Sequence, residues 1–162
     1  MSQPLVLNRR NTRLLRRRKG MTALEVAIAI GAGLLFLAAA AFGIIRFLDN
    51  QRYNVMNRLA GSQAVALLGQ IYGQQGTLAA LTTANGVGIL TGMGLKATTP
   101  WGGVWTVSTA GGASTVSLSF PLGGPQLATA GTTFASNMIT QYPMVSCTFT
   151  SPNMICAYNV AQ

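Results

Sequence analysis

The feature that most restricts the fold is an apolar run over residues 21–45, in which Glu25 is the only ionisable side chain. A helix needs about 20 apolar residues to cross a bilayer core of about 30 Å, so this run is long enough to span one. The cations that precede it are Arg9, Arg10, Arg13, Arg16, Arg17, Arg18 and Lys19. Because Lys and Arg beside an apolar span stay on the cytoplasmic side, residues 1–20 are expected to be a cytoplasmic leader.

The formal net charge of +9 suggests nucleic acid or an anionic membrane as a partner until its location is considered. Most of this charge lies in the leader. A product that starts at Met21 keeps only Glu25 and Asp49 as acids, against the cations Arg46, Arg52, Arg58 and Lys96, which gives a net side-chain charge of +2. The charge therefore favours an orientation signal over a DNA-binding arm, and we expect no nucleic-acid binding by the mature chain.

The helix is predicted to continue beyond the apolar run and to become amphipathic over residues 46–73. Apolar side chains there recur with the period of a helix that packs on a sheet, and Gly73 and Gly76 should end it. At 1.5 Å per residue, about fifty residues give a helix of roughly 75 Å. Its apolar half would then protrude from the rest of the chain. Gly31, Gly33 and Gly43 weaken this half by nearly 1 kcal/mol each but permit close packing in a bundle.

Glu25 is unusual because an acid in lipid is costly and usually has a partner or a role. Cleavage between Gly20 and Met21 would create an α-amino group that is largely protonated at neutral pH. A helix cannot easily fold its first residue back onto its fifth side chain. The amine of Met21 is therefore expected to pair with Glu25 of a neighbouring, axially shifted subunit.

This junction resembles the leader and mature start of a type IV pilin. The matching residues are Arg-Arg-Arg-Lys-Gly followed by Met-Thr-Ala-Leu-Glu and an uninterrupted apolar run. The resemblance implies cleavage by prepilin peptidase after Gly20, N-methylation of Met21 and an assembly role for Glu25. Met at the first mature position and a twenty-residue leader resemble the type IVb subclass, and Pro-Trp-Gly-Gly at residues 100–103 is similar to pilins of thin conjugative pili.

Residues 74–162 are predicted to form a globular head. Its connector, residues 76–100, corresponds to the αβ-loop of pilins and contains a possible short helix at residues 77–83. Strands are predicted at residues 104–107, 114–120, 145–150 and 154–160, with a helix at residues 133–141. Trp101 and Trp105 are interpreted as core aromatics in preference to a surface binding role.

Cys147 and Cys156 are predicted to form a disulfide. They lie in the part of the chain that a cytoplasmic leader would place across the membrane, where thiols are oxidised. A metal site is disfavoured because the chain has no His and no acid after Asp49. In a hairpin around Pro152 the two cysteines fall opposite or nearly opposite each other. They also resemble the cysteine pair near the C-terminus of pilins.

The same lack of titratable groups argues against an enzyme, since general acid–base catalysis needs such groups close together. No catalytic residue, metal or cofactor is therefore predicted. The Ser and Thr residues have no nearby base to activate them as nucleophiles.

The sequence thus predicts an α+β pilin fold and a structural subunit, the major pilin of a type IVb pilus. The expected partners are identical subunits, prepilin peptidase and the assembly platform of the inner membrane, with a final location in an extracellular pilus. Alternatives are a minor pilin or pseudopilin, a membrane-anchored periplasmic binding protein, and a secreted protein cut by signal peptidase within residues 38–41.

Overall fold

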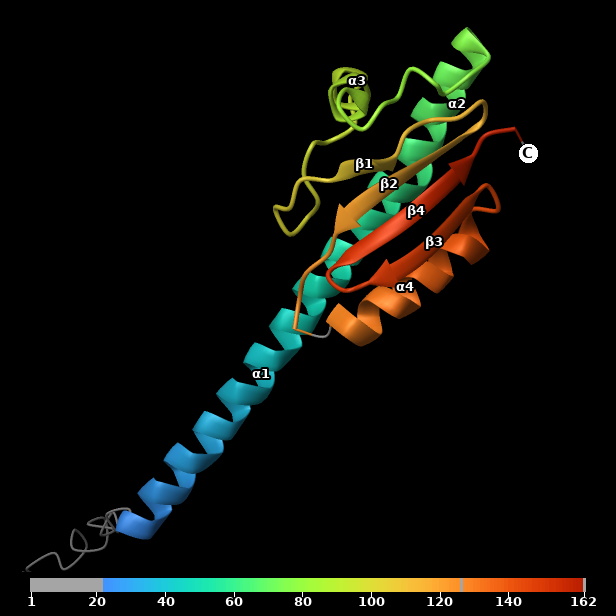
Figure 1. Ribbon diagram of the computed structural model, residues 1–162. Helices are drawn as coiled ribbons and strands as arrows, with labels where there is room; N and C mark the ends of the chain where they lie inside the picture. Colours follow the sequence, from blue (N-terminus) through green and yellow to red (C-terminus); the bar gives the residue numbers. More distant parts are fainter. Residues whose placement is uncertain (1–21, 126, 162) are drawn as a thin grey trace, which may run out of the picture. The chain divides into compact units, whose positions relative to one another are not determined.

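The computed structural model describes residues 22–125 and 127–161. They form an α+β fold with a long N-terminal helix, a four-stranded antiparallel sheet and one disulfide (Figure 1). The chain divides after Gly43 into two compact units. The predicted leader, residues 1–20, and Met21 lie outside the described residues.

The long helix consists of α1 (Ala23–Asn57), a π-helical segment η1 (Arg58–Gln63) and α2 (Ala64–Gln75). It ends where Gly76 adopts a left-handed conformation, with φ of 68°, and donates its N–H to the carbonyl of Tyr72. Glycine tolerates this conformation because it lacks a Cβ, so Gly76 terminates the helix. The end lies within the stretch that the sequence predicts.

The π-helical segment follows from the spacing of the buried residues. Met56, Ala60, Ala64 and Leu68 are buried at intervals of four. In a regular α-helix, four residues turn by about 400°, so each interval would shift the buried face by about 40°. A π-helical turn holds one more residue and offsets this shift. Accordingly, the N–H of Ala64 donates to the carbonyl of Leu59, five residues earlier, and to that of Gly61.

The C-terminal unit, residues 44–161, builds its sheet in the order β1-β2-β4-β3. The strands are β1 (Thr106–Thr109), β2 (Thr115–Pro121), β3 (Val145–Thr150) and β4 (Asn153–Asn159). β2 pairs with β4 along its whole length, and β3 and β4 form a hairpin in which Cys147 faces Cys156. Two further helices, α3 (Gly86–Gly92) and α4 (Leu127–Gln141), complete the unit.

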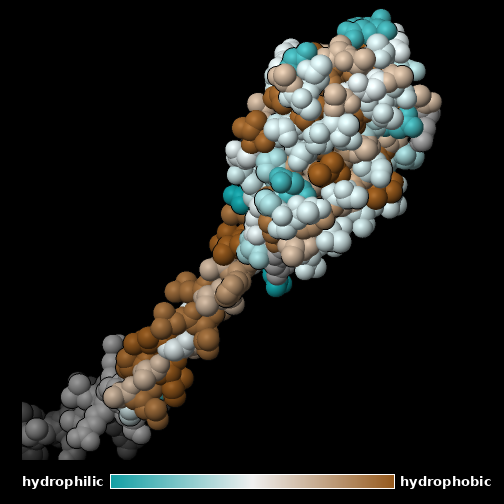
Figure 2. Space-filling view, viewed as in Figure 1, coloured by the Kyte–Doolittle hydropathy of each residue, from teal (hydrophilic) through white to brown (hydrophobic). Residues whose placement is uncertain are grey.

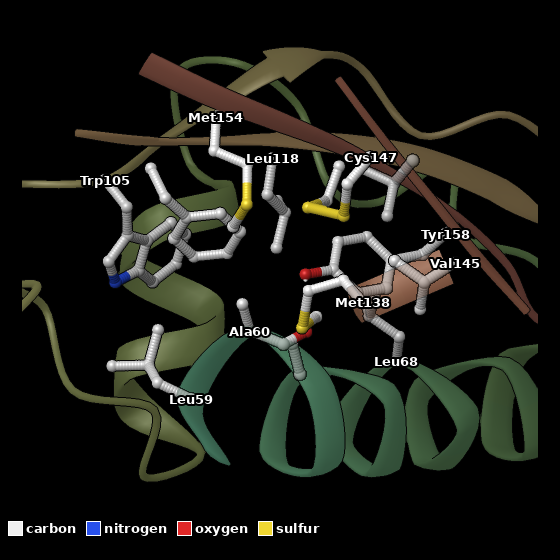
Figure 3. Packing of buried hydrophobic residues seen from close by; sticks show 14 of the residues in the cluster. Leu59, Ala60, Leu68, Trp105, Leu118, Met138, Val145, Cys147, Met154 and Tyr158 are labelled. Carbon is white, nitrogen blue, oxygen red and sulfur yellow. Dashed lines mark hydrogen bonds between the residues drawn. A yellow bond between two sulfur atoms is a disulfide. The ribbon is translucent and has the colours of Figure 1, made fainter. Parts of the chain in front are cut away.

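The core lies between the helix and one face of the sheet (Figure 3). Alternate strand residues point into it, as the two-residue period of a strand requires. The largest fully buried side chains include Trp105, Phe120 and Tyr158. α4 contributes Phe134, Ala135 and Met138 at helical spacing. The side chains on the opposite face of the sheet are exposed or half-buried in the described part of the chain.

Three predicted elements differ clearly from those in the structure: the helix at residues 77–83, the first strand and α4. The helix predicted at residues 77–83 does not form, and the short helix is α3. The earlier segment is held instead by the β1–β2 loop: the N–H of Leu78 donates to the carbonyl of Ala113, and the N–H of Gly111 donates to the carbonyl of Leu81. These long-range bonds use backbone groups that a local helix would need.

The first strand begins at Thr106, two residues later than predicted. Trp105 comes directly before the strand, and its indole N–H donates to the carbonyl of Lys96 at 2.6 Å. Val104 forms only an isolated bridge with Thr98. α4 begins at Leu127, six residues before the predicted start.

Candidate assembly helix

Every side chain of residues 22–47 is exposed, although most are apolar. Leu35 and Phe36 are 74% and 77% exposed, values usual for charged residues rather than for Leu and Phe. Figure 2 shows this stretch as an almost continuous hydrophobic surface. The helix is long and apolar enough to cross a membrane. Its surface requires lipid or other apolar partners, because contiguous apolar patches of this extent are rare in monomeric soluble proteins.

The glycines in this segment pack against no other part of the chain within residues 22–125 and 127–161. A Cβ added at Gly31, Gly33 or Gly43 would meet nothing within 4 Å. Each glycine therefore lowers helix stability without an intramolecular contact that explains it. Close approach by another helix is the remaining structural use for a small residue there.

Glu25 lies in the first turn of α1 and caps it together with Thr22. The Thr22 N–H donates to Oε2 of Glu25 at 2.8 Å, and the Glu25 N–H donates to Oγ1 of Thr22 at 3.3 Å. This reciprocal pair is a capping box, which satisfies two backbone donors of the helix N-terminus. Sequence reasoning missed this role, although Thr-Ala-Leu-Glu before an apolar run is its recognised signature.

The structure does not test the other residues predicted at the junction. Gly20 and Met21 fall outside the described residues, so their cleavage and methylation, and the pairing of Met21 with Glu25, stay predictions. Glu25 is exposed, and one of its carboxylate oxygens already accepts the Thr22 N–H. The second oxygen makes no hydrogen bond with any residue from 22 onward that the structure describes.

A second group of aromatic and charged side chains surrounds the β2–α4 loop. Tyr53 contacts Trp101 with ring centroids 4.9 Å apart, and the Trp101 ring packs where a side chain on Gly123 would lie. A side chain on Gly124 would likewise meet the carboxylate of Asp49, which forms an ion pair with Arg52 at 3.5 Å. Burial, with a smaller contribution from the charge of Asp49, raises the pKa of Tyr53.

These contacts give the loop a structural role. Gly124 has φ of 113°, which L side chains rarely adopt, so glycine is required there for its conformation as well as for space. Trp105 is fully buried, as a core aromatic should be, whereas Trp101 lies at the edge of the core, and its buried indole nitrogen makes no hydrogen bond with the part of the chain that the structure describes.

Cys147 and Cys156 form the predicted disulfide, with a Cα–Cα distance of 4.1 Å. Both are buried in the core, and the bond joins the adjacent strands β3 and β4 on the face of the sheet that packs against the helix. Within residues 22–125 and 127–161, no cluster of three or more His, Cys, Asp or Glu side chains could hold a metal ion.

Comparison of the chain with protein-family models, curated proteins and solved structures finds no match.

Proposed function

We propose that this protein is the structural subunit of a type IVb pilus, with the major pilin as its specific role. The observation that carries the proposal is the helix surface of residues 22–47, which is apolar on all sides and exposed. Such a rod is stable in two environments, a bilayer and a bundle of like rods. A filament subunit uses both in succession.

The driving force for assembly follows from the size of the exposed side chains. Burying a Leu, Ile or Phe side chain contributes about 1.5–3 kcal/mol relative to leaving it in water. More than ten such side chains are exposed along this helix, among them Leu24, Ile28, Leu34 and Phe42. Packing against neighbouring copies therefore offers enough free energy to hold a polymer together after the helix leaves the lipid.

The proposed sequence of events combines this surface with the resemblance at the junction. The chain inserts into the inner membrane with its cationic leader in the cytoplasm, prepilin peptidase cuts after Gly20, and Met21 is methylated. The assembly platform then moves the subunit into a filament of identical copies outside the cell. Met21 as the first mature residue and the twenty-residue leader favour the type IVb subclass.

Two substitutions separate the charge of Glu25 from its capping role. Glu25→Gln keeps an N3 side chain that can cap the helix but removes the charge, whereas Glu25→Ala removes both. If Glu25 pairs with a cation of a neighbouring copy, both variants will lose surface filaments while the membrane-bound subunit persists. Equal filament yield from Glu25→Gln and the unmodified protein would limit Glu25 to capping. Filament yield is measured by electron microscopy of sheared surface fractions.

Intact mass and N-terminal sequencing of the protein from its native cells test the proposal directly. A start at Met21 with one added methyl group supports it, and electron microscopy should show filaments that disappear when the gene is deleted. An intact Met1 would indicate a permanently anchored protein, and a start near Ala41 would indicate a secreted one. Either result in cells with active prepilin peptidase would overturn the proposal.

A further inference from the structure

The solvent-facing side of the sheet carries hydroxyl groups in register across neighbouring strands. One row holds Thr106, Ser119, Ile155 and Thr148, and the next holds Ser117, Ala157 and Ser146. Rows two residues apart along a strand are separated by about 6.8 Å. None of these side chains is charged, and Figure 2 shows the sheet side of this unit mostly in the pale colours of intermediate hydropathy.

A groove lies at one end of this face. The residues that line it are Thr115, Pro143, Met144, Val145, Ser146, Ala157, Tyr158 and Asn159. In the neighbouring row the equivalent residue of β4 is Ile155, whose side chain is larger than that of Ala157. The groove has a volume of about 230 Å³. This is below the roughly 300–1,000 Å³ of sites for drug-sized ligands, so it suits one small ring-sized unit.

The hydroxyl groups in the groove are not used within the fold. Those of Thr115 and Ser146 make no hydrogen bond with any other described residue. The hydroxyl groups on α4 provide a contrast, because those of Thr132, Ser136 and Thr140 each donate to the carbonyl four residues earlier. Thr and Ser on the helix are thus internally satisfied, whereas those in the groove offer both a donor and an acceptor to a ligand.

We propose that this groove binds a neutral saccharide unit. The uncharged hydroxyl and amide groups of Thr115, Ser146 and Asn159, beside the apolar side chains of Ala157 and Pro143, match the alternation of hydroxyls and C–H groups on a sugar ring. A charged ligand would find no complementary charge among the side chains that line the groove. The proposal concerns the isolated subunit and does not depend on filament formation, so it can fail while the proposed function stands, and the reverse also holds.

Saturation-transfer NMR on the full-length protein tests this inference. The protein is held in phosphocholine micelles, which contain no sugar, and the probes are neutral trisaccharides of glucose, galactose and N-acetylglucosamine at millimolar concentration. At least one probe is expected to receive saturation from the protein. Absence of transfer to all three probes would overturn the proposal.

Variants locate the binding. Ala157→Phe places a large side chain, of a type that strands favour, at a residue that lines the groove, and it should abolish transfer. The double variant Thr115→Ala and Ser146→Ala removes two hydrogen-bonding groups and should weaken binding about tenfold. Thr150→Ala is the matched control, because it removes a hydroxyl from the same strand and the same face outside the groove. Transfer that survives Ala157→Phe in a folded protein, or that is lost equally in the control, would place the site elsewhere.

Discussion

Gly61 and Gly69 are helical glycines with opposite surroundings. A Cβ on Gly61 would fall on the ring of Tyr142, whereas a Cβ on Gly69 would meet nothing within 4 Å. Gly61 lies in the π-helical segment and is buried, and Gly69 is exposed on α2. The first glycine is required by packing within the chain, and the second is not.

Alanine substitutions at these two positions should therefore change stability in opposite directions. Gly61→Ala is expected to destabilise the C-terminal unit by about 1–3 kcal/mol, because the Tyr142 ring must move. Gly69→Ala is expected to stabilise it by about 0.5–1 kcal/mol through helix propensity. Urea denaturation of the two variants measures both effects. A destabilising Gly69→Ala would show that its surroundings are not open.

Tyr158 links the last strand to the long helix. Its side chain is 1% exposed, and its hydroxyl donates to the carbonyl of Ala60 at 2.6 Å. Burial raises the pKa of Tyr158 well above its ordinary value of 10.0. The folded state therefore holds the phenol proton more tightly than the unfolded chain does.

This difference predicts how stability depends on pH. Below about pH 10 the phenol is protonated in both states, so Tyr158 causes no pH dependence. Above that value the unfolded chain loses the proton first, and stability should fall as pH rises. Tyr158→Phe should cost about 1–3 kcal/mol at neutral pH and flatten the alkaline decline. Tyr53, whose pKa burial also raises, leaves a residual slope.

Denaturation at several pH values checks this prediction, with Tyr72→Phe as the control. The hydroxyl of Tyr72 makes no side-chain hydrogen bond within the described parts of the chain. An unchanged alkaline decline in Tyr158→Phe would contradict the assignment.

Among the elements, the β3–β4 hairpin was the most predictable because its signals are local. Alternating side chains define both strands and Pro152 lies in the turn, whereas the sequence left the register open and the structure places Cys147 directly opposite Cys156. The pairing of β2 with β4 was not predictable in this way, since α4 and β3 lie between them in the sequence. The helix expected at residues 77–83 failed for the same reason: its backbone groups bond to a distant loop, which local propensity cannot indicate.

Removing the disulfide should destabilise the hairpin and with it the C-terminal unit. Cys147 and Cys156 are nine residues apart, and closing a loop of this size is worth about 2–3 kcal/mol by the loop-entropy model. The variant with Cys147→Ala and Cys156→Ala should lose this amount in urea denaturation. The unmodified protein measured with reductant should lose a similar amount. A loss in the variant alone would point to altered packing instead of the missing cross-link.

For the molecule as a whole, the core belongs entirely to the C-terminal unit. The first buried side chain along the described chain is Met56, and all residues of the core cluster follow it. The sequence predicted the long apolar helix and the antiparallel sheet, because both depend on hydrophobic pattern. It did not predict the capping role of Glu25. A charge in an apolar run suggested a partner in a neighbouring subunit, whereas the structure shows a local pair with Thr22.

A chain that begins at Ile44 should accordingly fold without lipid or detergent. It omits the apolar segment up to Gly43 but retains every residue that is buried in the described chain. We expect a soluble monomer whose unfolding free energy is within about 0.5 kcal/mol of that of the full-length protein in micelles, since changes at exposed positions usually alter stability by no more than that. Size-exclusion chromatography and urea denaturation measure both properties. Aggregation or non-cooperative unfolding would show that residues 22–43 support the fold.

The π-helical segment also determines where the long helix tolerates a change in length. Removing one residue from α2 would turn everything N-terminal to the deletion by about 100° and bring its buried face out of alignment with the sheet. Removing one residue from Arg58–Gln63 would instead convert the wide turn into an ordinary α-helical one and leave both faces aligned. The segment thus behaves as a one-residue spacer, and related chains of different helix length would be expected to gain or lose their residue at this turn.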